Sequence, residues 1–205
     1  MRSFSHWNAA YAKDRAKLAL YTFCYPGAPW IVPEAVRMLE SWLKPEHVGF
    51  EWGAGRSTVW FSSRVSAMTS IEHDEAWYAR VQRAVHARPV ANVTLHCVPA
   101  SESRYEHAIC AVADESLDFV LVDGLSDRRD ACAWAALPKI RVNGILIVDD
   151  VHRYLPSGSR APRALPRGAA PFTKLWKDVS IALGNWTYRN FTSGVTDTGV
   201  WTRTA

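Results

Sequence analysis

Apolar and polar residues alternate along the chain in two ways. In residues 8–20 and 33–43 the apolar positions fall near helical spacing, and Pro33 suits the first turn of a helix. From His47 on, short apolar runs alternate with helix-length mixtures of polar and apolar residues. This second pattern is typical of repeated strand–helix units that build a parallel sheet. The sequence therefore predicts an α/β fold that begins with a helical cap over residues 1–44.

The apolar runs predict five strands, at residues 48–51, 67–72, 93–98, 117–123 and 144–149. Four helices are expected near residues 57–63, 75–88, 127–137 and 172–183. Residues 186–204 alternate again and turn at Ser193 and Gly194, which predicts a final antiparallel hairpin. We expect a Rossmann-like parallel sheet with helices on both faces and a C-terminal antiparallel hairpin.

Length and composition favour one globular domain. The chain has 205 residues, of which 48% are hydrophobic and 21% charged, and this excludes a disordered or fibrous protein. We expect the cap and a Rossmann-like core over residues 45–205 to form a single domain. No segment approaches the roughly 18 apolar residues that cross a bilayer, and the four cysteines form no CxxC pair. These features predict buried thiols and a cytoplasmic protein that does not contact membranes.

Positive charge is concentrated in one segment. The formal net charge is +4, and residues 151–177 contain six basic residues and no acidic one: Arg153, Arg160, Arg163, Arg167, Lys174 and Lys177. Prolines and glycines interrupt this stretch, which predicts a basic loop over residues 151–171. Two interpretations stay open, a solvated surface loop and a loop that recruits an anionic substrate.

The sharpest local pattern is VGFEWGAGRSTVWF, a short strand that ends in Glu51 and passes through Gly53 and Gly55 into a helix near Ser57. Glycines permit a tight turn and the close approach of a ligand to the backbone. Glu72 ends the next predicted strand, at the distance where an acidic side chain reaches a ribose. The turn suits a dinucleotide or S-adenosylmethionine. Glu51 favours the second, because a carboxylate orients a cationic amino acid moiety, whereas a pyrophosphate gains nothing from it.

A purely structural interpretation is a tight turn in which Glu51 pairs with Arg56. However, the segments EWGAGRST, SIEHDEAWY, DFVLVDG and GILIVDDV, in this order, resemble the class I S-adenosylmethionine-dependent methyltransferases. The resemblance covers residues 47–203. One departure is Ser57, which stands where many members have a third glycine, although serine is a good residue for the start of a helix.

The resemblance implies a role for each matching residue. The methionine part of the cofactor would lie against Glu51, Gly53 and Gly55, with Ser57 at the helix start. Glu72 would bind the ribose hydroxyls. The remaining implied cofactor contacts are His73, Ala100 and Ser101 around the adenine, and Asp123 beside the methyl donor.

Acidic residues end the fourth and fifth predicted strands. Asp123, Asp149 and Asp150, followed by His152, should converge because ligands bind at the carboxyl ends of strands in open α/β sheets. Related methyltransferases that act on catechols hold a magnesium-like ion with an Asp and an Asp-Asn pair, and here the pair is Asp-Asp. The three aspartates are therefore candidate ligands of a divalent cation. In a structural alternative, Asp149 caps its strand and Asp150 pairs with downstream arginines. In a metal-free catalytic alternative, Asp150 or His152 accepts the proton of the methyl acceptor.

We therefore expect a methyltransferase that uses S-adenosylmethionine to methylate an oxygen of a small-molecule acceptor, and the basic loop makes an anionic acceptor one candidate. Three alternatives stay open: an RNA methyltransferase, an NAD-dependent oxidoreductase and an inert cofactor-binding module. Few aromatic residues accompany the basic ones in residues 151–177, so nucleic acid is not the expected partner.

Overall fold

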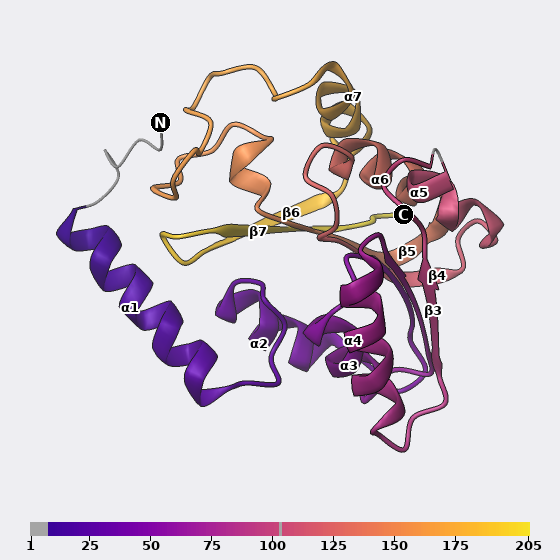
Figure 1. Cartoon of the computed structure of the whole chain (residues 1–205). Coiled ribbons are helices and arrows are strands. Elements are labelled where there is room, and N and C mark those ends of the chain that lie inside the picture. Colours follow the sequence, from indigo (N-terminus) through magenta and orange to yellow (C-terminus); the bar gives the residue numbers. More distant parts are fainter. Residues whose placement is uncertain (1–7, 103) are drawn as a thin grey trace.

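The centre of the protein is a seven-stranded sheet, seen in a computed structural model that describes residues 8–102 and 104–205 (Figure 1). The strands are β1 (Val48–Trp52), β2 (Ala67–Glu72), β3 (Val93–Cys97), β4 (Leu117–Val122), β5 (Ile140–Asp149), β6 (Thr187–Thr192) and β7 (Asp197–Thr202). They lie in the order β3-β2-β1-β4-β5-β7-β6. The first five strands are parallel, and β7 pairs antiparallel with both β5 and β6. The predicted parallel sheet and antiparallel hairpin are confirmed.

Helices cover both faces of this sheet, as predicted (Figure 1). One face carries α2 (Pro33–Trp42), α3 (Arg56–Ser62) and α4 (Glu75–His86), drawn below the sheet in Figure 1. The other face carries α5 (Arg104–His107), α6 (Arg129–Ala136) and α7 (Lys174–Ala182), drawn above it. Short 3₁₀ turns occupy Ala108–Ala111, Leu137–Lys139 and Val151–Arg153.

The alternation of side chains along β4 explains how the two layers are held. All six residues of β4 are buried. Val120 and Val122 pack into the core under α6 and α7, while Phe119 and Leu121 pack into the core under α2 and α3. Burying one such side chain contributes about 1.5–3 kcal/mol, so the central strand anchors both helical layers. This rigid centre fixes the carboxyl ends of β1, β4 and β5.

Helix α1 (Ala9–Cys24) lies apart from the sheet, at the left of Figure 1. Asn8 caps it by accepting a hydrogen bond from the Tyr11 backbone N–H at 2.9 Å. None of its sixteen residues is buried. An ion pair of 3.0 Å between Asp14 and Arg160 connects the helix to the basic loop. The expected helical segment at the start of the chain is therefore present, with little apolar packing of its own.

The surface bears on two expectations from the sequence, membrane contact and the burial of the cysteines. In residues 8–102 and 104–205 no helix is long and apolar enough to cross a membrane. The four cysteines are free thiols, but only Cys132 is buried, and Cys24 and Cys110 are exposed. The expectation of buried thiols is thus wrong for these two exposed positions.

Candidate functional site

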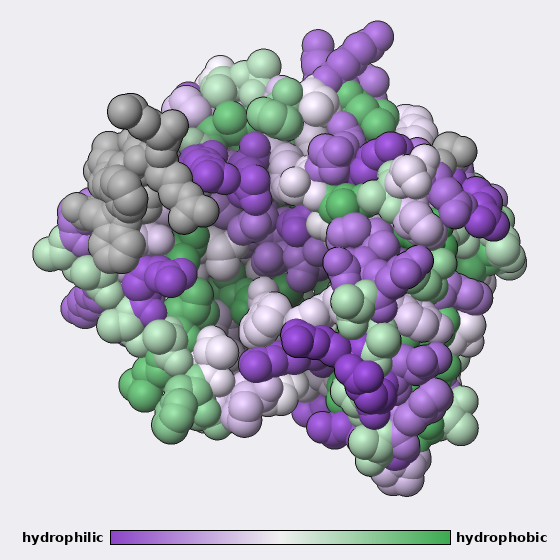
Figure 2. Space-filling model, in the orientation of Figure 1, coloured by the Kyte–Doolittle hydropathy of each residue, from purple (hydrophilic) through white to green (hydrophobic). Residues whose placement is uncertain are grey.

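A cavity of about 710 Å³ opens where the turn after β1 meets the ends of β2 and β4. Figure 2 shows a hollow near the middle of the molecule, bordered largely by hydrophilic residues. The cavity is lined by Trp30, Gly53, Ala54, Gly55, Arg56, Ser57, Glu72, His73, Asp74, Ala76, Trp77, Arg80, Asp123 and Gly124. Six residues proposed from the sequence therefore meet in one place: Gly53, Gly55, Ser57, Glu72, His73 and Asp123.

The two glycines of the turn have different physical roles. Gly53 has a φ of +93°, and a Cβ on it would lie 2.7 Å from the backbone oxygen of Asp123. Only glycine fits this conformation and this approach to the end of β4. Gly55 has extended backbone, and a Cβ there would meet the Trp77 side chain at 3.9 Å, an ordinary contact. The missing side chain of Gly55 keeps the cavity wall open rather than permitting the turn.

Glu51 lies beneath this turn and does not line the cavity. The residue is completely buried, and its Oε1 accepts hydrogen bonds from Thr58 Oγ1 and from Ser70 Oγ, the latter at 2.7 Å. Thr58 Oγ1 also accepts a hydrogen bond of 2.9 Å from the Gly55 backbone N–H. Burial raises the pKa of Glu51 to about 7, although these hydroxyl hydrogen bonds oppose the rise. Glu51 therefore supports the turn, its Oε2 has no hydrogen-bond partner among the described residues, and its expected contact with the cofactor stays a prediction.

The pairing of Glu51 with Arg56, considered as a structural alternative, is wrong. Arg56 lines the cavity and lies over the ring of Trp30, with 4.9 Å between its Cζ and the ring centroid. The Glu51 carboxylate accepts hydrogen bonds from the hydroxyl groups of Thr58 and Ser70 and does not pair with Arg56.

Glu72 is held rigidly at the end of β2. Its Oε1 accepts hydrogen bonds from the backbone N–H groups of His73, at 2.8 Å, and Asp74, at 2.9 Å. His73 Nδ1 lies 3.0 Å from the same oxygen, and its ring contacts Tyr105 edge to face. These contacts fix one carboxylate oxygen, and the second stays available to a ligand in the cavity.

Two predicted cofactor residues do not reach this cavity. Ala100 and Ser101 are exposed in the turn after β3 and are absent from the cavity lining. Strand β3 is two places from β1 in the sheet, so its carboxyl end lies further from the glycine turn than the ends of β2 and β4 do. The adenine-edge role that the resemblance implies for them stays a prediction.

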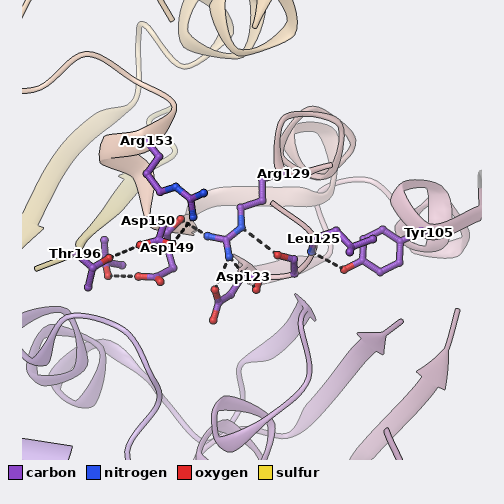
Figure 3. A network of polar contacts seen from close by, with 10 residues as sticks. Tyr105, Asp123, Leu125, Arg129, Asp149, Asp150, Arg153 and Thr196 are labelled. Atoms are coloured by element: carbon purple, nitrogen blue, oxygen red, sulfur yellow. Dashed lines mark hydrogen bonds and ion pairs between the residues drawn. The ribbon is translucent and has the colours of Figure 1, made fainter. Parts of the chain in front are cut away.

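Arg129 joins the carboxyl ends of β4 and β5 (Figure 3). Its guanidinium donates to the Asp123 carboxylate at 2.9 Å. It also donates to the backbone oxygens of Asp123, Gly124 and Asp149. Only 6% of Arg129 is exposed. A planar guanidinium can donate several hydrogen bonds at once. The cation among the acidic ends of β4 and β5 is therefore the side chain of Arg129.

The three carboxylates expected to bind a divalent cation are bound by protein groups instead. Beside the Asp123–Arg129 pair, Asp149 accepts from Thr198 Oγ1 at 2.8 Å, and Asp150 accepts from Thr196 Oγ1 at 2.6 Å. In the described ranges, no three or more His, Cys, Asp or Glu side chains are grouped so that they could hold a metal ion. This corrects the expected site, because the guanidinium supplies the charge that a cation would bring.

The aspartates differ in how readily they ionise. Burial raises the pKa of Asp123 to about 6, although the charge of Arg129 lowers it. Burial and the charges of Asp123 and Asp150 raise the pKa of Asp149 well above its usual range. Burial would raise the pKa of Asp150 too, but the hydrogen bond from Thr196 and the charge of Arg129 bring it below the usual value. Asp150 also pairs with Arg153 at 3.1 Å, as the alternative interpretation predicted.

His152 lies in the 3₁₀ turn after β5 and is only 2% exposed. Its Nδ1 accepts a hydrogen bond from the Asp197 backbone N–H at 3.2 Å, and the ring also bonds the backbone of Pro162. Burial lowers the pKa of His152, although the charge of Asp150 raises it. The ring does not line the cavity. His152 thus ties the basic loop to β7, which speaks against its expected role as the proton acceptor.

Sequence reasoning missed an aromatic and basic wall of the cavity. Trp30, from the segment between α1 and α2, stacks on Trp77 with 6.1 Å between the ring centroids. Arg80 lies over Trp77 at 5.9 Å. The positions of Trp77 and Arg80, three residues apart on α4, place them on one helix face and were a usable signal. Trp30 lies in a segment with Pro26, Gly27 and Pro29, and its sequence position gives no such signal.

The glycine turn, the acidic end of β2 and the cavity between them lie on a Rossmann-like sheet, an arrangement typical of α/β methyltransferases. Residues 50–151 match a family model described as a methyltransferase domain. This stretch is therefore similar to a methyltransferase domain, and the sheet has the Rossmann-like fold of methyltransferases.

Solved structures agree with this fold. A protein from Corynebacterium glutamicum matches with a TM-score of 0.61 and 14% identity, over 98% of this chain and 93% of that one. An rRNA methylase from Streptococcus thermophilus matches with a TM-score of 0.60 and 9% identity, over 87% and 100%. A SAM-dependent methyltransferase from Aquifex aeolicus matches with a TM-score of 0.54 and 14% identity, over 93% and 96%. At these identities the similarity concerns the fold. No curated protein matches the sequence.

Proposed function

We propose that this protein transfers the methyl group of S-adenosylmethionine to an oxygen atom of a small anionic molecule. The observation that carries the proposal is the meeting of Gly53, Gly55 and Glu72 in one cavity at the carboxyl edge of the sheet. Ligands of open α/β sheets bind at this edge. A cytosolic location, expected from the sequence, stays a prediction.

The residues present fit the cofactor. When bound, S-adenosylmethionine supplies a methyl group on a positively charged sulfur. Gly55 leaves room for the methionine part, because no Cβ projects into the cavity. The second oxygen of Glu72 is available for the ribose hydroxyls, since the first is held by backbone N–H groups. His73, whose side chain is 34% exposed, lies beside Glu72 in the cavity wall and is the residue proposed to contact the adenine.

Support for an anionic acceptor comes from the basic loop. Arg153 and Arg160 are paired with Asp150 and Asp14, so they do not contribute free positive charge. Arg163 and Arg167, however, are exposed and form no ion pair with another described residue. Free arginines on a loop steer anions towards a site.

The proposed cofactor is tested by calorimetry with S-adenosylmethionine and, separately, with NAD. Binding of the first and not the second is expected, and the opposite result would favour an oxidoreductase. Glu72→Ala should weaken S-adenosylmethionine binding about 10- to 100-fold, because a hydrogen bond to a charged group is worth about 1.5–3 kcal/mol. Glu102→Ala is the control, since Glu102 carries a carboxylate outside the cavity and pairs with exposed Arg104. Equal affinities of the two variants would contradict the assignment of Glu72.

The methyl acceptor is identified by incubating the protein with labelled S-adenosylmethionine and pools of sugars, phenols and RNA. Label in a small anionic molecule is the expected result. Label in RNA would replace the proposed acceptor class, and the absence of any label, in a protein that binds the cofactor, would indicate an inert binding module.

Asp123 is the proposed proton acceptor, in place of His152 and Asp150. It lines the cavity, only one of its oxygens is bound by Arg129, and its pKa is about 6. The protonated carboxyl cannot accept a proton, so kcat/KM should fall about tenfold per pH unit below 6 and level off above 7. Asp123→Asn should lower the plateau at least 100-fold. A pH profile on the acceptor found by labelling tests this, and a rate independent of pH between 5 and 7 would rule Asp123 out.

A further inference from the structure

Arg56 is a cation of the cavity wall whose bonding capacity the protein does not use. It is the first residue of α3 and directly follows Gly55. Its Nη1 atom is buried without a hydrogen-bond partner, and Arg56 forms no ion pair with any residue in 8–102 and 104–205. A buried donor without a partner is costly, so such a group in a cavity wall points to a ligand that completes its bonding.

The charges around the cavity are distributed unevenly. Glu72, Asp74 and Asp123 contribute acidic groups, and Arg56 and Arg80 contribute the guanidinium groups. S-adenosylmethionine carries an ammonium and a sulfonium, but only one anionic group, the carboxylate of its methionine part. The acidic residues would repel that carboxylate. It therefore has to lie on the side of the cavity that carries the arginines.

The position of the glycine turn decides between the two arginines. Gly53 and Gly55 lie where the methionine part is proposed to bind, and Arg56 is their immediate neighbour in the chain. Arg80 lies in the second turn of α4, on the ring of Trp77. We propose that the Arg56 guanidinium binds the carboxylate of the methionine part of S-adenosylmethionine, an inference that rests on the proposed function.

Trp30 orients this guanidinium. The Cζ of Arg56 lies 4.9 Å from the centroid of the Trp30 ring, which itself stacks on Trp77. A guanidinium that lies on an aromatic face keeps the N–H groups of its edge free, and this edge matches the two oxygens of a carboxylate. The segment between α1 and α2 thus takes part in cofactor binding through an aromatic surface.

The test compares S-adenosylmethionine with its decarboxylated form, which lacks only the carboxylate, by calorimetry. The wild-type protein should bind the complete cofactor about 10- to 100-fold more tightly. Arg56→Met should remove this preference by weakening binding of the complete cofactor alone. Arg80→Met, a matched control that removes the other guanidinium of the wall, should keep it. Circular dichroism checks that each variant is folded, and Arg56→Lys, which retains the charge without the planar fork, should keep part of the preference.

Three results would overturn the inference while leaving the proposed cofactor in place: equal affinities of the wild-type protein for both ligands, a preference that survives in folded Arg56→Met, or a preference lost in Arg80→Met and not in Arg56→Met. Failure of the wild-type protein to bind either ligand would overturn the proposed function, and this inference with it.

Discussion

Arg129→Met is expected to lower the free energy of unfolding by about 3–5 kcal/mol at pH 8, because removing one member of a buried charge cluster leaves the other charges unpaired. In the wild-type protein this guanidinium binds the carboxylate of Asp123 and the backbone oxygens at the ends of β4 and β5. Methionine has similar length but offers no donor. The ends of both strands would therefore lose the cation that holds them together.

The loss should depend on pH in a defined direction. Asp123 and Asp149 have raised pKa values, and the Arg129 charge opposes the rise in both. Without Arg129 both carboxyl groups bind protons more readily. At pH 5 they are therefore less charged in the variant, and their unpaired charge destabilises it less than at pH 8. The difference in unfolding free energy between wild type and variant should thus shrink as the pH falls from 8 to 5.

Urea unfolding at the two pH values measures this difference. Arg153→Met is the matched control, because Arg153 also pairs with an aspartate of the cluster but its side chain is 30% exposed. That variant should lose less than about 1 kcal/mol. If both variants were equally stable, the guanidinium of Arg129 would not be the group that holds the strand ends.

Gly53→Val should remove cofactor binding and destabilise the fold by about 3 kcal/mol or more. A β-branched residue is a severe outlier at φ +93°, and its Cβ would lie 2.7 Å from the backbone of Asp123. The turn after β1 would have to move away from the end of β4. Because both segments line the cavity, the binding site would be lost with the turn.

Gly55→Ala should separate the loss of cofactor binding from the loss of stability. Its backbone is extended, and the added Cβ would meet Trp77 at no less than 3.9 Å. The free energy of unfolding should therefore change by less than about 1 kcal/mol, while a methyl group in the cavity wall weakens S-adenosylmethionine binding about tenfold. Urea unfolding and calorimetry on both variants provide the measurements. A Gly53→Val protein as stable as Gly55→Ala would show that the turn does not need a left-handed residue.

The order of strands and helices was predictable because each element has a strong local pattern. Strand β4, for example, is apolar throughout except for Asp118, and buried strands of parallel sheets have such runs. The turn through Gly53 and Gly55 was predictable because glycines between a strand and a helix are typical of a tight turn that a ligand approaches closely. Glu72 was predictable from its spacing alone.

Other parts of the site depend on contacts that no local pattern records. Arg129 follows another arginine in a polar stretch, and only the packing of α6 against β4 and β5 turns it towards the aspartates. Glu51 precedes the glycines as expected, but hydroxyl groups from α3 and β2 enclose it. Trp30 reaches the cavity through a segment that the sequence shows as an aromatic cluster. Such long-range contacts decide which neighbour a side chain meets.

The position of β7 has a consequence for the newly made chain. β7 lies between β5 and β6, yet it is the last of the seven strands to leave the ribosome. Until then β5 and β6 are separate, and each presents an unpaired edge that can pair wrongly or recruit a chaperone. Thr198 and Asp197, which bond Asp149 and His152, arrive with the same strand. A nascent chain can thus assemble its glycine turn early, but the hydrogen bonds to Asp149 and His152 at the end of β5 form last.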